Sequence, residues 1–93
     1  MSNDNETIRW PTNLDRPAIE HRLVRVAELA TERQLLDLAQ RFASVSKMSA
    51  AQIASNVVGA LTWLLNQPAA ERSSLDGITR ELEMVALNLK NLK

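Results

Sequence analysis

Apolar residues recur at helical spacing along residues 18–45, a segment without Gly or Pro. The recurring positions are Ile19, Leu23, Val26, Ala30, Leu35, Leu38, Phe42 and Val45. This period predicts an amphipathic helix. The step of five from Ala30 to Leu35 leaves two interpretations open. One long helix with a rotated stripe is preferred, because no Gly or Pro enforces a break. The alternative is two helices meeting near Thr31, where Thr31 and Gln34 match a capping box.

A second helix is predicted for residues 49–66, where Ser49 and Gln52 match another capping box ahead of an apolar run. No charged residue occurs from Met48 to Ala70. The apolar run is shorter and more polar than the roughly 20 residues of a membrane span, so we expect no membrane insertion. A helix that is apolar nearly all round is buried on most sides. So small a chain has little else to cover it, which indicates a partner chain.

A third helix is predicted for residues 74–92, with Ser73 or Ser74 as its cap. Its apolar residues alternate steps of three and four, as in a heptad seam. They are Leu75, Ile78, Leu82, Val85, Leu89 and Leu92. The seam either lies on the chain's own core or pairs with a second chain.

The N-terminal part is predicted to be non-helical. Residues 1–7 are expected to form a flexible leader, and residues 8–17 an extended arm with Trp10 as a buried anchor. Trp10 precedes a proline, which favours an extended backbone. Asp15 is expected to cap the first helix, with Pro17 in its first turn. Together the segments predict an all-α fold: one domain over residues 1–93, a small bundle of three to four helices with an extended N-terminal arm.

Composition narrows the possible functions. The 93 residues include 11 basic and 11 acidic side chains, so the formal net charge is zero. This balance argues against a strongly basic protein that coats nucleic acid. With no Cys, one His and two Gly, we predict no catalytic site, no metal and no cofactor, and so no enzyme and no small-molecule substrate. The polar first residues lack the pattern of a secretory signal, so a cytoplasmic location is expected.

Small residues four apart in the second helix suggest close helix contacts. Ala51, Ser55 and Gly59 share this spacing, and Trp63 continues it. Such spacing lets two helix backbones approach closely, either within one chain or between chains. The preferred function is a non-catalytic protein–protein interaction module: a homodimer, or a small subunit or adaptor that binds another helical protein. Its predicted interface residues are Ala51, Ser55, Gly59, Trp63, Leu82, Val85, Leu89 and Leu92.

Two stretches, Thr7-Ile8-Arg9-Trp10-Pro11 and Leu23-Val24-Arg25-Val26-Ala27-Glu28, resemble the start of the ribbon-helix-helix repressors. In that family a short strand pairs across a dimer, and its outward side chains enter the major groove of DNA. The resemblance implies that Thr7 and Arg9 contact DNA while Ile8 and Trp10 pack inward. The alternative function is therefore a dimeric DNA-binding regulator whose strand is residues 6–10. Because the match covers less than half the chain and lacks the family's glycine turn and basic excess, nucleic-acid binding is not favoured.

Overall fold

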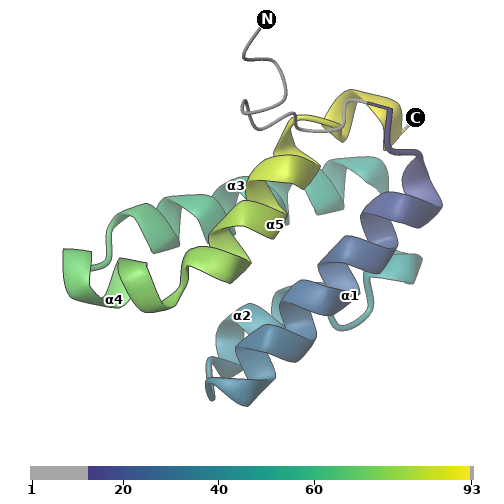
Figure 1. The fold of residues 1–93 in the computed structure, drawn as a ribbon. Coiled ribbons are helices and arrows are strands. Elements are labelled where there is room, and N and C mark those ends of the chain that lie inside the picture. Colours follow the sequence, from purple (N-terminus) through teal and green to yellow (C-terminus); the bar gives the residue numbers. More distant parts are fainter. Residues whose placement is uncertain (1–12, 93) are drawn as a thin grey trace, which may run out of the picture.

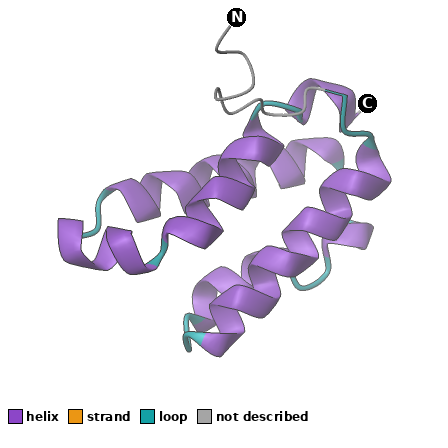
Figure 2. Ribbon diagram, in the orientation of Figure 1, coloured by secondary structure: helices purple, strands orange, loops and turns teal. Residues whose placement is uncertain are grey.

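The structure is a computed structural model and describes residues 13–92. Within this range the chain forms helices and no strand (Figure 1, Figure 2). The elements in chain order are α1 (Arg16–Glu32), α2 (Leu36–Phe42), the 3₁₀ helix η2 (Val45–Lys47), α3 (Ala50–Leu65), α4 (Ala69–Ser74), α5 (Asp76–Ala86) and the 3₁₀ helix η3 (Leu89–Leu92). The predicted all-α bundle is confirmed. The predicted leader and most of the predicted arm, including Trp10, lie outside the described residues.

Helix α1 begins as its sequence predicts. The Asp15 side chain accepts a hydrogen bond from the Ala18 N–H at 3.0 Å, and Pro17 lies in the first turn. An N-cap side chain of this kind satisfies one of the backbone donors that the first turn leaves free. The helix starts at Arg16, two residues before the start predicted for it.

The preferred single helix over residues 18–45 is wrong, because the chain breaks into α1 and α2. Gln34 has φ 63°, in the left-handed region. The Leu35 N–H donates to the Ala30 carbonyl at 2.8 Å, and the Gln34 N–H donates to the Thr31 carbonyl at 3.0 Å. This pair of bonds is a Schellman motif, which ends helices and usually has Gly at the left-handed position. The alternative of two helices near Thr31 is therefore correct, although Thr31 does not act as a cap: its hydroxyl donates to the Ala27 carbonyl.

Helix α3 confirms the prediction for residues 49–66 to within one residue at each end. The Ser49 hydroxyl accepts from the Gln52 N–H at 3.1 Å, and the Gln52 side chain accepts from the Ser49 N–H at 2.7 Å. Both bonds of the predicted capping box are present, so the local sequence alone specifies this start.

The single helix predicted for residues 74–92 is divided in the structure into the end of α4, α5 and η3. Neither serine caps α5, whose N-cap residue is Leu75, and the Ser74 hydroxyl donates to the Glu71 carbonyl instead. At the other end, the buried Asn88 side chain donates to the Met84 carbonyl at 2.8 Å and accepts from the Leu14 N–H at 3.0 Å. A side-chain amide that takes a helix carbonyl competes with the backbone ladder. Asn88 therefore accompanies the end of α5 and ties it to the chain before α1.

The helices form two layers, with α1 and α5 in front of α2 and α3 in the view of Figure 1. Helix α1 packs against α2 and α5, and α5 packs in turn against α3, whereas α2 and α3 meet through few residues. One apolar core joins the layers, and its largest fully buried side chains include Phe42, Ile19, Leu23, Ile53 and Leu64. The weak contact between α2 and α3 leaves a groove on that side of the molecule.

Candidate functional site

The surface of α3 that points away from the core is exposed and contains no charged residue. We call this surface the α3 outer face, and its members are Ala51, Ser55, Val58, Thr62 and Leu65. Val58 is 57% exposed and Leu65 is 59% exposed. The steps of four and three between these five positions keep them in one stripe along the helix.

The Thr62 hydroxyl does not prevent this face from being covered. The Thr62 hydroxyl donates to the Val58 carbonyl at 2.9 Å, so its hydrogen has a partner inside the helix. Burying a polar group costs little when its hydrogen bond is kept, and a great deal when it is lost. The α3 outer face can therefore be removed from water without leaving the Thr62 donor unsatisfied.

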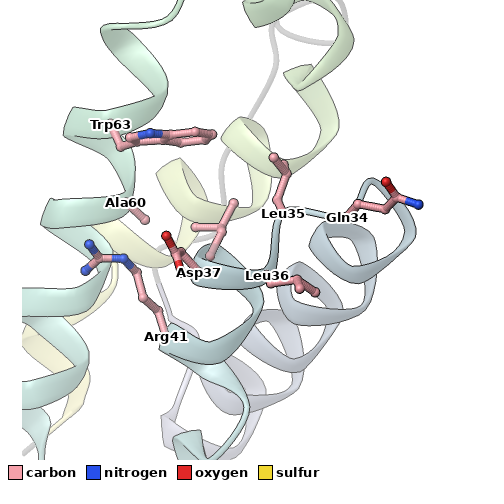
Figure 3. Close-up of a pocket in the computed structure, with 8 residues that line it drawn as sticks. Gln34, Leu35, Leu36, Asp37, Arg41, Ala60 and Trp63 are labelled. Atoms are coloured by element: carbon pink, nitrogen blue, oxygen red, sulfur yellow. The ribbon is translucent and has the colours of Figure 1, made fainter.

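Beside this face lies a groove between α2 and α3, with a volume of about 410 Å³. Figure 3 shows the Trp63 ring extending from α3 across the start of α2, with Leu35 on the far side and Asp37 and Arg41 below. We call it the α2–α3 groove, and its lining residues are Gln34, Leu35, Leu36, Asp37, Leu38, Arg41, Ala60 and Trp63. Leu36, at 61% exposed, projects at its rim. Aromatic and aliphatic walls with two charged groups are typical of pockets that take an apolar anchor.

Gly59 lies close to the Arg41 side chain at this groove. A Cβ atom at Gly59 would lie 3.1 Å from Arg41 Nη1, so the guanidinium passes close over the helix backbone there. The Asn56 side chain donates to the Arg41 carbonyl at 3.1 Å and holds the end of α2 on α3. A larger residue here would require a small shift of the exposed end of the Arg41 side chain.

The structure divides the predicted small-residue interface into two parts. Ala51 and Ser55 lie on the α3 outer face, whereas Gly59 and Trp63 lie toward α2. Four-residue steps advance by 40° more than a full turn, so such a row drifts around a helix. An interchain role for these residues stays a prediction, although all four retain accessible surface.

The predicted seam lies mainly inside the protein. Leu82, Val85 and Leu92 are buried in the core, and Leu89 is partly buried against it. Helix α5 directs this stripe toward α1 and α3 of the same chain. The apolar surface of Leu82, Val85 and Leu92 is thus already covered, and the stripe serves the fold.

Among residues 13–92 the most exposed large apolar side chains are Leu36, Val58 and Leu65, and sequence reasoning did not select them. For Leu36 a signal was available, since adjacent leucines in a helix cannot both face the same core. For Val58 and Leu65 the signal was the uncharged run from Met48 to Ala70. Such a run contains outward-facing positions as well as inward-facing ones, and the outward-facing positions form the α3 outer face.

The arginine-rich first half does not form an unpaired basic surface along α1. Arg16 pairs with Glu20 at 2.7 Å, Arg22 with Glu81 at 3.0 Å and Arg25 with Glu28 at 3.9 Å. Thr7 and Arg9, the predicted DNA contacts, lie outside the described residues, and their role stays a prediction.

Residues 13–92 contain no group of three or more His, Cys, Asp or Glu side chains placed to hold a metal ion. No helix in the same range is long and apolar enough to cross a membrane.

Comparison with known proteins gives no match for this chain. No family model matches it, and neither curated proteins nor solved structures show significant similarity to it. The α3 outer face and the α2–α3 groove are therefore the features of the molecule that bear on its function.

Proposed function

We propose that this protein is a non-catalytic protein–protein interaction module that binds a helical partner through the α3 outer face. The observation that carries this proposal is an exposed helix surface with no charge, in a chain of which 24% of the residues are charged. Exposed helix surfaces usually carry charged residues opposite their apolar stripe. A surface that lacks them avoids the cost of removing charges from water when a partner covers it.

The exposed apolar residues of this face would contribute to the binding of a partner. Full burial of a Val or Leu side chain contributes about 1.5–3 kcal/mol relative to full exposure, so covering the exposed parts of Val58 and Leu65 contributes about 1 kcal/mol each. Association costs several kcal/mol in lost freedom, so these two residues need neighbours. Trp63, 40% exposed, lines the neighbouring α2–α3 groove and belongs to the residue type most often found at the centre of binding interfaces.

The proposal is tested by placing a photoreactive benzoyl-phenylalanine at position 58 or position 24 in cells that express the protein. Val24 is the matched control, because it is also a valine on an exposed helix surface, 43% exposed on α1. We expect a covalent adduct of discrete mass from position 58 and none above background from position 24. Equal adducts from both positions, or none from either, would overturn the proposal.

A further inference from the structure

We infer that the α2–α3 groove binds a lysine side chain of a partner protein, with the ammonium group held between the Trp63 ring and the Asp37 carboxylate. The inference goes beyond the proposed function, because it concerns this groove and not the α3 outer face. It follows from three features of the groove: an aromatic face turned into it, a carboxylate that forms no ion pair, and an aliphatic lining between the two.

The Trp63 ring turns one of its faces into the groove. Figure 3 shows the ring edge-on above Ala60, with Asp37 on the side toward which the lower face of the ring is turned. The residue is 40% exposed, so part of the ring remains open to a ligand. The face of an aromatic ring attracts a nearby ammonium or guanidinium group, and Trp does so most strongly. A cation that enters the groove below Trp63 therefore meets a favourable electrostatic surface.

The Asp37 carboxylate adds a full negative charge to the lining of the groove. It forms no ion pair with another residue of the range 13–92, although Arg41 lies four positions further along α2. Opposite charges at this spacing on a helix often pair with each other. Because this pair is not formed, the Asp37 oxygens remain available to accept hydrogen bonds from a ligand. A carboxylate opposite an aromatic face is complementary to a cation.

Arg41 lies at the other end of the groove. Its Nη1 atom is 3.1 Å from the position that a Cβ atom at Gly59 would take, and its carbonyl accepts from the Asn56 side chain. Gly59 precedes Trp63 by about one turn of α3, or about 6 Å along the helix. Asp37 lies one turn nearer to the start of α2, across which the Trp63 ring extends. The groove therefore has a negative end beside Trp63 and a positive end beside Gly59.

The lining between these ends is aliphatic. Leu35, Leu38 and Ala60 contribute it, and the groove has a volume of about 410 Å³. Lysine combines a flexible aliphatic stem with a compact ammonium group, so its stem can cover apolar surface while its head reaches a charged partner. A bare metal ion would leave this lining uncovered, and a purely apolar side chain would leave the Asp37 charge without a partner. The lining and the charge together match lysine.

Single blocked residues test the groove without a known partner. The probes are the Nα-acetyl N-methylamides of lysine, norleucine and glutamate, because norleucine has the aliphatic chain of lysine without its charge. The chain has two tryptophans, so Trp10→Phe leaves Trp63 as the only one, and its fluorescence reports binding. At constant ionic strength the lysine probe should bind at least about threefold more tightly than the norleucine probe. Equal binding of these two, tightest binding of the glutamate probe, or no response to any probe would overturn the inference.

Asp37→Asn tests the role of the carboxylate, because it keeps the size of the side chain and removes its charge. The preference for the lysine probe over the norleucine probe should fall at least about twofold. Glu83→Gln is the matched control, since it removes one negative charge from an exposed residue of α5 that does not line the groove. This control should keep the full preference. An unchanged preference in Asp37→Asn, or an equal loss in both variants, would contradict a direct contact with Asp37.

Two further variants test the two ends of the groove. Trp63→Leu keeps an apolar wall but removes the aromatic face, so the preference for the lysine probe should fall at least about twofold. Chemical shifts of the Leu38 and Ala60 amides follow binding where the tryptophan is absent. Arg41→Gln removes a like charge and should tighten binding of the lysine probe about twofold. Circular dichroism checks that the helices persist. A preference that Trp63→Leu leaves unchanged, or weaker lysine binding in Arg41→Gln, would contradict the proposed placement of the ammonium group.

Failure of this inference is distinguishable from failure of the proposed function. The probes report on the α2–α3 groove alone, whereas the photo-adduct at position 58 reports on the α3 outer face. A groove that does not select the lysine probe overturns this inference and leaves the proposed function standing. Selective binding of the lysine probe supports the inference whether or not position 58 gives an adduct.

Discussion

Helices α1 and α3 are nearly equal in length, with 17 and 16 residues, and they bury the same pattern of positions. Helix α1 buries Ile19, Leu23, Val26 and Ala30, and α3 buries Ile53, Val57, Ala60 and Leu64. In both helices the steps are four, three and four. The inner surfaces therefore meet the same packing requirement with nearly the same residues.

Their outer surfaces differ in charge. Helix α1 exposes Arg25, Glu28 and Glu32 and links its charges to neighbours by ion pairs. Helix α3 exposes alanine, serine, valine, threonine and leucine. Since α1 shows that this core tolerates a charged outer surface, the fold does not require the uncharged one of α3. The difference points to a requirement other than folding, which is the reason for assigning a partner to α3.

The strongest test of the shared burial pattern replaces the first buried residue of each helix. Ile19→Ala and Ile53→Ala each leave a cavity at a fully buried position, so each should lower the free energy of unfolding by about 2–5 kcal/mol. Chemical denaturation at one fixed protein concentration measures the loss. Where an alanine variant does not fold, Ile→Val should cost about 0.5–1.5 kcal/mol. A much smaller cost in α3 than in α1 would show that the two inner surfaces are not equivalent.

The capped starts of the two helices allow a second matched test. Asp15→Ala and Ser49→Ala each remove a side-chain acceptor from a first-turn N–H, so each should cost about 1 kcal/mol. Thermal denaturation followed by circular dichroism provides the measurement. Asp15→Asn and Ser49→Asp keep an acceptor and should cost little, so a full loss in these controls would contradict the capping role.

The ends of the two helices differ, and Gln34 makes this difference testable. The C-cap residues Arg33 and Asn66 have similar φ values, −98° and −90°, but the residue after the cap is left-handed in α1, where it is Gln34, and not in α3. Gln34→Gly should raise the free energy of unfolding by about 1 kcal/mol, because glycine adopts positive φ without a steric cost. Gln34→Val should lower it instead. Equal stability of all three proteins in urea would contradict a left-handed residue at this position.

The smallest expected effect concerns the charged surface of α1. Arg22 and Glu81 join α1 to α5 at 3.0 Å but remain partly exposed. A double-mutant cycle with Arg22→Gln and Glu81→Gln should give a coupling of about 1 kcal/mol or less, decreasing as salt is added. A salt-independent coupling of several kcal/mol would mean that the charged surface stabilises the fold and is not merely tolerated by it.

The local sequence was sufficient to predict those features in which a side chain forms a hydrogen bond with the backbone close to it in the chain. Asp15 and Ser49 specify two helix starts through bonds to residues only three positions away. The buried stripes of α1 and α3 were likewise apparent, because a period of 3.6 residues is a property of the chain itself. Of the residues on the α3 outer face, Ala51 and Ser55 were predicted from their spacing along the helix.

Other features depended on contacts between distant residues. The break at Gln34 occurs without glycine, and the Leu35 that follows it packs against the core. Asn88 binds Leu14 from 74 positions away, which no local pattern indicates. Gly59 lies close to Arg41, a residue on another helix.

The linear order of residues thus determines which helices form and which stripe of each is apolar, since both follow from local hydrogen bonds and helical period. It does not determine which stripe the chain can cover with its own residues. That depends on how the helices meet: α5 turns Leu82 and Val85 inward, and no described helix covers Val58 and Leu65. Burial is a property of the packed molecule, and in this protein it distinguishes the residues that hold the fold from those left to bind.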